Sequence, residues 1–332
     1  MENKSYKALV VEELNENEFF VEVKEKTVND LPAGDVVVRV KYSSLNYKDA
    51  LSAIGNKGVT RNYPHTPGID AAGIVEASTR DEFKPGDEVV VTSYDLGMDT
   101  PGGYGQYIRI PADWVIKLPS GLTLKESMVF GTAGFTASMS VYRLSSVVKP
   151  EHGEILVTGA TGGVGSMAVA ILSKLGYYVV AASGKSDAVE FLKEIGASKT
   201  ISRKEVTENS DRQIMKGRWA GVIDTVGGDM LAAAIKSTIH LGVITCCGNV
   251  ASPELPINVF PFILRGVSLV GIDSQNCPLN HRKELWEKLS RDWKPEFPAD
   301  FHNEISLEEL NDNIRLILKG KLKGRTLVNL GS

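Results

Sequence analysis

Cysteine is scarce in this chain of 332 residues. The three cysteines are Cys246, Cys247 and Cys277, and three are too few for a disulfide framework or for a zinc site built from four cysteines. Cys246 and Cys247 are neighbours in the apolar run GVITCCG, where buried free thiols are expected. The cysteines therefore predict neither a disulfide-rich protein nor a four-cysteine zinc site.

The chain also lacks a long apolar run and an excess of basic residues. No run approaches the roughly 20 residues that a membrane-spanning helix needs. Lys and Arg total 37 against 41 Asp and Glu, whereas a nucleic-acid-binding protein normally carries a basic face. The first residues, MENKSYKALVVEE, place acids where a secretory signal needs an apolar segment. We expect a cytoplasmic protein that binds neither nucleic acid nor a membrane.

The remaining composition is that of a folded protein, with 42% hydrophobic and 23% charged residues. The length suggests about two domains. Within the first 120 residues, short strand-like runs cover 35–45, 71–77 and 88–92 and are separated by turns rich in Pro and Gly. Many short strands without intervening amphipathic helices indicate a partly closed β-barrel or a sandwich.

The pattern changes near Thr123. Thr123 and Glu126 have the spacing of a helix capping box, as do Ser306 and Glu309. Between them, apolar strand-like runs alternate with helical ones, among them a helix expected over 228–240, which predicts βα units around a parallel sheet. The segment 324–330 reads as a last strand. We divide the chain into a β-rich domain, 1–125, completed by about 297–332, and an α/β domain, 126–296.

The strongest local motif is ILVTGATGGVGS, from Ile155 to Ser166. A buried strand enters a glycine-rich turn and a helix follows, so the backbone and the helix N-terminus can approach a pyrophosphate closely. The residues predicted to bind there are Thr161, Gly162, Gly163 and Val164.

The choice between NAD and NADP depends on the end of the next strand. An NAD site usually has a carboxylate about 20 residues after the turn, but the sequence there is Ser183-Gly184-Lys185. Ser183 can donate to a 2′-phosphate, and Lys185 and Arg203 can supply positive charge. These residues predict NADP(H), unless Lys185 is merely a solvated surface charge.

Several motifs occur in order along nearly the whole chain. They are SSLNYKDA (43–50), PGID (67–70), KPGDEV (84–89), GTAGFT (131–136), TGATGGVG (158–165) and PFILR (261–265). With these motifs the chain resembles the medium-chain dehydrogenase/reductase superfamily, the group of alcohol dehydrogenases and quinone oxidoreductases. More narrowly, it resembles the YhdH/YhfP type of quinone oxidoreductase, some members of which are NADPH-dependent acrylyl-CoA reductases. The resemblance implies an α/β protein in which a GroES-like catalytic domain is combined with a doubly wound Rossmann domain.

Zinc-dependent relatives place a ligand Cys where this chain has Asn46 and Tyr47, and a His-Glu pair where it has Ile69 and Asp70. A catalytic zinc needs three protein ligands, and His65 stands alone nearby. We therefore expect no zinc.

Without a metal, the charge that develops on the substrate needs hydrogen-bond donors, and the substrate carbon needs a proton. Tyr47 is the candidate proton donor or substrate-orienting group, Asn46 a candidate amide donor, and Asp49 a candidate to orient Tyr47 or the nicotinamide ribose. Alternatively, Tyr47 only packs over the nicotinamide, and water delivers the proton.

The resemblance implies further cofactor contacts along the chain. Phe262 and Ile263 could equally belong to the core. The residues are Tyr47, Thr132, Cys247, Gly248, Phe262, Ile263, Ser274 and Arg325.

Two functions remain open. The first is NADPH-dependent reduction of acrylyl-CoA or a close 2-enoyl thioester, for which Lys57 and Arg61 could form a basic rim for the CoA phosphates, unless they are solvated loop charges. The second is reduction of a quinone or reactive enone. A third, less favoured, is an NADPH-binding protein with little turnover. Proteins of this fold commonly dimerise through sheet edges, so we expect a homodimer with an edge at 268–272.

Overall fold

The computed structural model describes residues 4–331, which form two compact units. The first contains the described residues up to Thr132, Gln275–Ser290, and those from His302 onward. The second contains Ala133–Ser274 and Arg291–Phe301. The helix α2 (Leu124–Ser145) begins in the first and continues into the second.

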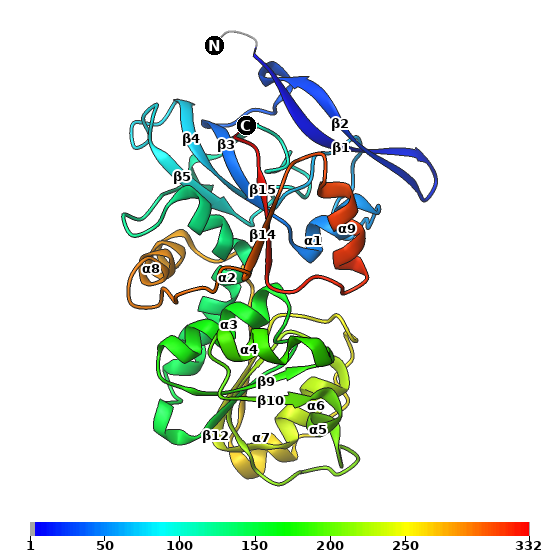
Figure 1. Cartoon of the computed structure of the whole chain (residues 1–332), viewed down its shortest axis with the longest axis vertical. Helices are drawn as coiled ribbons and strands as arrows, with labels where there is room; N and C mark the ends of the chain where they lie inside the picture. The colour runs from blue at the N-terminus through cyan, green and yellow to red at the C-terminus, as the bar shows by residue number, and fades with distance from the viewer. Residues whose placement is uncertain (1–3, 332) are drawn as a thin grey trace. The chain divides into compact units, whose positions relative to one another are not determined.

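The first unit is built mainly from β-strands (Figure 1). Its larger sheet has the order β14-β15-β3-β4-β5-β7, and β6 also pairs with β3. All its pairs are antiparallel except β14 with β15. The strands are β3 (Val36–Ser44), β4 (Asp70–Ser78), β5 (Glu88–Thr92), β6 (Tyr107–Ile110), β7 (Ile116–Lys117), β14 (His302–Ile305) and β15 (Arg325–Asn329).

A hairpin of β1 (Ser5–Asn15) and β2 (Glu18–Thr27), which the sequence analysis did not predict, forms a separate two-stranded sheet. Three further helices belong to this unit: α1 (Tyr47–Ala53), α8 (Leu279–Leu289) and α9 (Leu310–Leu318). The apolar faces of β3, β4 and β5 form one core with residues of α1, α9 and β15. This packing fixes α1, and with it Tyr47, against the sheet.

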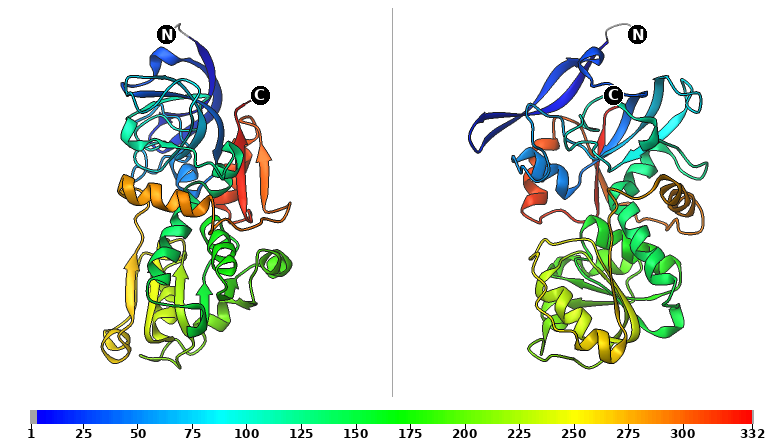
Figure 2. Two further views of the ribbon diagram at one scale, coloured as in Figure 1. Left: turned by 90° about the vertical axis from the view of Figure 1, so that its left-hand side faces the viewer. Right: turned by 180° about the vertical axis from the view of Figure 1, so that it is seen from behind.

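The second unit is a six-stranded parallel sheet in the order β10-β9-β8-β11-β12-β13. Counted along the chain, this is the order 3-2-1-4-5-6 of a doubly wound Rossmann fold, and helices cover both faces (Figures 1 and 2). The prediction of a parallel α/β sheet is therefore confirmed. The strands are β8 (Glu154–Val157), β9 (Tyr178–Ser183), β10 (Lys199–Ser202), β11 (Trp219–Asp224), β12 (Thr238–Cys246) and β13 (Ser268–Gly271).

The helices of this unit are α3 (Gly163–Lys174), α4 (Val189–Glu194), α5 (Arg203–Thr207), α6 (Gly228–Lys236) and α7 (Phe260–Arg265). The helix predicted over 228–240 is wrong at its end, because 238–240 already belong to β12. The hydroxyl of Ser237 donates to the carbonyl of Ala233 at 2.7 Å and that of Thr238 to Ala234 at 2.7 Å. These bonds occupy carbonyls of the last helical turn, and β-branched Thr238 favours the extended strand.

Both predicted capping boxes form. Thr123 Oγ1 accepts from the amide of Glu126 at 3.1 Å, and Glu126 accepts from the Thr123 amide at 2.9 Å. Ser306 and Glu309 make the same reciprocal pair before α9. Cys246 and Cys247 are residues of intermediate exposure, whereas buried free thiols were expected. No helix within residues 4–331 is long and apolar enough to cross a membrane.

Candidate functional site

The glycine-rich turn predicted to bind phosphate links β8 to α3 in the second unit. Thr161 and Gly162 lie in the turn, and Gly163 and Val164 open the helix. Gly162 caps the helix in an extended conformation without a side-chain hydrogen bond. A helix N-terminus carries a partial positive charge and unsatisfied amides, so this one is suited to an anion.

Gly165 shows why the turn needs glycine. A Cβ at this position would lie 2.3 Å from the carbonyl oxygen of Gly159 and 2.8 Å from Cα of Ala160. Only a glycine lets the first turn of α3 pack this closely on the end of β8. The close packing keeps the helix N-terminus at the carboxyl edge of the sheet, where doubly wound proteins bind their ligands.

The residues predicted to select NADP lie together at the ends of β9 and β10. Ser183 ends β9 and pairs with Ser202, the last residue of β10, while Arg203 opens α5. A Cβ on Gly184 would lie 2.7 Å from Nε of Arg203, so the guanidinium rests on the glycine. Burial lowers the pKa of Lys185, and repulsion from Arg203 lowers it further. Two neighbouring cations beside a serine hydroxyl can bind a phosphate.

The other predicted cofactor residues of this unit differ in their surroundings. The amide of Cys247 donates to the carbonyl of Asp224 at 3.1 Å, which holds the chain leading to Gly248 against the end of β11. Burial raises the pKa of Cys247 to about 12, so its thiol stays protonated at neutral pH. On α7, Phe262 packs against the core of the unit, whereas Ile263 is 70% exposed. Ser274 follows the edge strand β13.

In the first unit, the carboxylate of Asp70 is the centre of a buried polar network. Asp70 is completely buried and Arg325 is 3% exposed. Oδ2 accepts from Oγ of Ser44 at 2.6 Å and from Nδ2 of Asn46 at 2.7 Å. Oδ1 accepts from Oγ1 of Thr132 at 2.6 Å, and both oxygens accept from the Thr132 amide. The network therefore joins the end of β3 and the start of β4 to α2.

The guanidinium of Arg325 completes this network. It lies 3.9 Å from Oδ2 of Asp70 and donates to Oγ of Ser44 at 2.7 Å, to Oδ1 of Asn46 at 3.3 Å and to the carbonyls of Leu45 and Val129. Burial lowers the pKa of Arg325, and Asp70 opposes that shift. Its donors serve these acceptors, and a cofactor contact by Arg325 stays a prediction. Thr132 likewise uses its hydroxyl and amide on Asp70.

Gly131 allows the kink of α2 to pass beside this network. Its φ is +51° with ψ −157°, outside the helical region. A Cβ there would lie 2.5 Å from Oδ2 of Asp70, 2.6 Å from Oγ of Ser44 and 2.8 Å from a guanidinium nitrogen of Arg325. These contacts explain why the first residue of the motif GTAGFT is a glycine.

Asp49 is surrounded by hydrogen-bond donors of the protein, and its predicted part in orienting Tyr47 or the nicotinamide ribose stays a prediction. It is fully buried, and its oxygens accept from the amides of Asn46 and Ile69 and from the hydroxyl of Tyr104, at 2.9, 2.8 and 2.9 Å. Burial and the nearby Asp70 raise its pKa to about 7. Asp49 makes no hydrogen bond to Tyr47 within the described residues. Because its acceptors are used by two backbone amides and the Tyr104 hydroxyl, it holds the start of α1 in place.

Tyr47 and Asn46 remain at the start of α1, with different exposure. Asn46 is the N-cap residue and lies almost completely within the network of Asp70. Tyr47 is the first helical residue and is 40% exposed. Of the three predicted catalytic side chains, Tyr47 is therefore the one that a substrate can reach most readily.

The two residues predicted to bind CoA phosphates are not equivalent. Nζ of Lys57 pairs with Glu13 at 2.6 Å and lies 4.7 Å from the ring centroid of Tyr63. The side chain of Arg61 is 80% exposed and lies 3.9 Å from Asp99. The ammonium group of Lys57 is thus already paired within the first unit. Arg61 is the more exposed cation and the better candidate to bind a phosphate.

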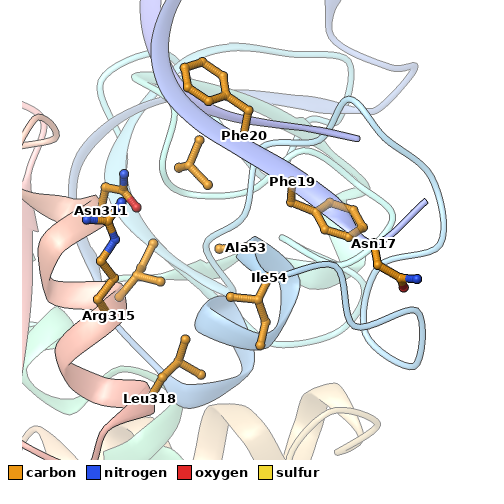
Figure 3. A pocket seen from close by; sticks show the side chains of 10 residues that line it. Asn17, Phe19, Phe20, Ala53, Ile54, Asn311, Arg315 and Leu318 are labelled. Carbon is orange, nitrogen blue, oxygen red and sulfur yellow. The ribbon is translucent and has the colours of Figure 1, made fainter. Parts of the chain in front are cut away.

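A groove of about 340 Å³ lies among β2, α1 and α9 in the first unit (Figure 3). Phe19, Phe20 and Ile54 provide apolar walls, and Asn311 and Arg315 lie on α9. None of the residues predicted for catalysis or cofactor binding is among the described residues that line it. The groove therefore does not coincide with the predicted site.

No group of three or more His, Cys, Asp or Glu in residues 4–331 could hold a metal ion. At the positions where zinc-dependent relatives place ligands, this chain has the amide of Asn46 and the carboxylate of Asp70, which bond to one another. From the sequence, Asp70 was expected only to stand where zinc-dependent relatives have a zinc ligand. Its place at the centre of the buried hydrogen-bond network was not predicted. An acid at the first residue of a buried strand is the signal that could have indicated it.

Comparisons with known proteins agree with this geometry. Residues 32–120 match the alcohol dehydrogenase GroES-like domain, and residues 163–291 match the zinc-binding dehydrogenase family. The chain is 45% identical, over 96% of its length and 97% of the relative's, to YhfP of Bacillus subtilis, whose name assigns it to the quinone oxidoreductases. It is 41% identical, over 98% and 100%, to the acrylyl-CoA reductase AcuI of Ruegeria pomeroyi.

Two solved structures are similar over almost the whole chain. One is the YhdH oxidoreductase of Salmonella enterica in complex with NADP, with 41% identity, a TM-score of 0.92, and coverage of 97% of this chain and 99% of that one. The other is YhfP of Bacillus subtilis with NAD bound, with 44% identity, a TM-score of 0.96, and coverage of 98% and 100%.

Proposed function

Because the chain belongs to the medium-chain dehydrogenase/reductase superfamily, in its YhdH/YhfP type of quinone oxidoreductase, we propose that it uses NADPH to reduce an activated carbon–carbon double bond. The substrate we assign is acrylyl-CoA or a close 2-enoyl thioester. The single observation that carries this proposal is the similarity along the entire length of an acrylyl-CoA reductase.

We assign the nucleotide to the second unit and catalysis to the first. The units divide at Thr132, Ser274, Ser290 and Phe301, and the boundaries near 125 and 297 stay predictions from the sequence. The turn from Thr161 to Val164 and the N-terminus of α3 are suited to the pyrophosphate. Ser183, Lys185 and Arg203 are suited to a 2′-phosphate. The candidate contacts for the nicotinamide half are Tyr47, Thr132, Cys247, Gly248, Phe262, Ile263, Ser274 and Arg325.

Cofactor choice is tested by measuring the dissociation constants of NADPH and NADH. Arg203→Ala should weaken NADPH at least tenfold and leave NADH nearly unchanged, since NADH has no 2′-phosphate. Lys204→Ala is the matched control, because it removes the adjacent cation, which we assign to the surface. Equal loss for both nucleotides, or tighter NADH binding by the wild type, would contradict the assignment to NADPH.

NADPH supplies the hydride when bound. The residues of the chain must stabilise the charge that develops on the substrate and deliver a proton to it. Hydride addition at the β-carbon of the substrate leaves enolate charge on the thioester oxygen, which needs positioned donors. The α-carbon then takes a proton. We assign proton delivery or substrate orientation to the hydroxyl of Tyr47. Asp70 and Arg325 hold Asn46, the residue before it, in place.

A quinone or reactive enone is the alternative substrate, since it needs the same cofactor and the YhfP name favours it. The test compares NADPH oxidation with acrylyl-CoA and with benzoquinone. A kcat/KM for acrylyl-CoA of about 10⁴ M⁻¹s⁻¹ or more, with benzoquinone far slower, would support the thioester. The reverse ranking would assign a quinone reductase, and silence with both despite NADPH binding would indicate a binding protein.

The CoA part of the substrate gives a second, independent test. If Arg61, with a smaller contribution from Lys57, contacts the CoA phosphates, Arg61→Ala should raise KM for acrylyl-CoA and leave KM for benzoquinone unchanged. An equal effect on both substrates would refute a role for Arg61 in CoA binding.

We also propose a homodimer. β13 pairs only with β12 among the described strands, and the nearby α7 carries the exposed apolar side chains of Ile263 and Leu264. An unpaired strand edge beside apolar side chains favours pairing with a second copy. Sedimentation of the wild type and of Val270→Pro distinguishes the two states. The expected cytoplasmic location is tested by cell fractionation.

A further inference from the structure

The carboxylate of Asp224 lies in a buried cluster that the proposed chemistry does not use. Asp224 ends β11 and is completely buried, as is Thr158, which follows β8. Oγ1 of Thr158 donates to Oδ1 of Asp224 at 2.6 Å. Oδ2 of Asp224 accepts from the amides of Val226 at 3.2 Å and Gly227 at 2.8 Å. Every partner of this carboxylate is therefore a donor.

Thr225, the residue after Asp224, makes two further hydrogen bonds to Thr158. Its amide donates to Oγ1 of Thr158 at 3.1 Å, and its hydroxyl donates to the carbonyl of Thr158 at 3.0 Å. Because the hydroxyl of Thr158 donates its hydrogen bond to Asp224, its oxygen can only accept from the amide of Thr225. The direction of each bond is thus determined, and three side chains connect the ends of two strands.

These two strands occupy a special place in the sheet. β8 and β11 are neighbours at the point where the order β10-β9-β8-β11-β12-β13 reverses direction along the chain. In doubly wound sheets the ligand binds in the crevice outside the carboxyl ends of the strands at this point. The cluster of Thr158, Asp224 and Thr225 therefore lies at the base of that crevice.

The loops that leave these strands are in close contact with the cluster. A Cβ on Gly159 would lie 2.3 Å from Oγ1 of Thr225, and a Cβ on Gly248 would lie 2.1 Å from the carbonyl oxygen of Thr225. The phosphate-binding turn and the loop after β12 therefore pack against Thr225. The amide of Cys247 also donates to the carbonyl of Asp224.

We propose that Asp224, Thr158 and Thr225 form a brace that positions the phosphate-binding turn and the Cys247–Gly248 loop for the dinucleotide. These are positioning residues, and the nucleotide need not contact them. The inference rests on the proposed NADP(H) site. It adds to that site a determinant that acts on the pyrophosphate and nicotinamide half of the cofactor and not on the 2′-phosphate, which is assigned to the ends of β9 and β10.

The test uses Thr158→Val, which keeps the β-branched shape and removes the hydroxyl. The dissociation constants of NADPH and of adenosine 2′-monophosphate are measured by calorimetry or competition. The fragment carries the 2′-phosphate but no pyrophosphate. Loss of the hydroxyl should weaken NADPH about tenfold, the equivalent of one buried hydrogen bond, and change fragment binding less than twofold. Thr225→Val should act in the same direction, with a smaller effect.

Thr238→Val is the matched control, because Thr238 is a completely buried threonine of the same sheet, at the opposite end of its strand, with its hydroxyl bonded to Ala234. It should leave both constants unchanged. The brace is refuted if Thr158→Val binds NADPH like the wild type, or if NADPH and the fragment weaken equally. If the wild type binds no NADPH, the proposed function fails as well, so the two failures are distinguishable.

Discussion

The buried pair of Asp70 and Arg325 provides a quantitative test of the network in the first unit. We consider Asp70→Asn, Arg325→Met and the double variant. Removing one partner of a buried ion pair leaves an uncompensated charge and costs about 3–5 kcal/mol. For a unit of this size, that lowers the melting temperature by roughly 6–20 °C. The double variant leaves neither charge unpaired and should cost clearly less than the sum of the two.

The structure also predicts which single substitution is worse. Without Arg325, Asp70 still accepts from Ser44, Asn46 and Thr132. In Asp70→Asn the guanidinium loses its countercharge, and the amide NH2 places a donor against the donors that one carboxylate oxygen accepted from. Asp70→Asn should therefore be more destabilising than Arg325→Met.

Differential scanning calorimetry of the three variants measures these effects, and Asp113→Asn, a change at an exposed acid, is the control. Surface changes of that kind alter the free energy of unfolding by about 0.5 kcal/mol or less. Additive losses within about 0.5 kcal/mol would refute the coupling of Asp70 and Arg325. So would a reversed order of the two single variants.

Three further predictions concern Asp49, Gly165 and Tyr47. The pKa of Asp49 is raised from 3.8 to about 7, so the native state holds a proton that the unfolded state has lost between those values. The free energy of unfolding must fall as pH rises through this window, by about 2–3 kcal/mol from pH 5 to 8. In urea unfolding, the free energy of unfolding of Asp49→Asn should lack this loss. Gly165→Ala forces a contact with the Gly159 carbonyl, so its NADPH affinity, measured by fluorescence titration, should fall strongly; unchanged binding would contradict the close packing. If Tyr47 delivers the proton, Tyr47→Phe should lower kcat at least about 100-fold without changing KM for NADPH, whereas an unchanged kcat would favour water.

The parallel sheet and the phosphate-binding turn were predictable because their signals are local. A strand, a glycine-rich turn and a helix follow one another within Ile155–Lys174, and each residue acts through its own backbone or its neighbours. The capping boxes are local for the same reason. The end of α6 was misplaced because the side chains of Ser237 and Thr238 bond to its last turn, a competition that apolar periodicity does not report.

The roles of Asp49 and Arg325 were not predictable in this way. Asp49 stands in the motif SSLNYKDA, and the resemblance implies a cofactor contact for Arg325, yet the fold buries both among donors and acceptors from distant segments. A charged residue in a motif reads the same whether it faces a ligand or another side chain. Its role depends on which distant residues the packing brings within hydrogen-bond distance.

By itself, the sequence determined the family, the alternation of strands and helices in the second unit, and the turn suited to a phosphate, because these depend on short segments and their spacing. Only the tertiary structure decided that Asp70 joins Asn46, Thr132 and Arg325 in one buried network, and that Asp224 ties β11 to β8. Those contacts join residues up to some 255 positions apart, since Asp70 and Arg325 are brought together by the pairing of β15 with β3 and of β3 with β4. Hydrogen bonds of this kind exist only when the whole core has formed.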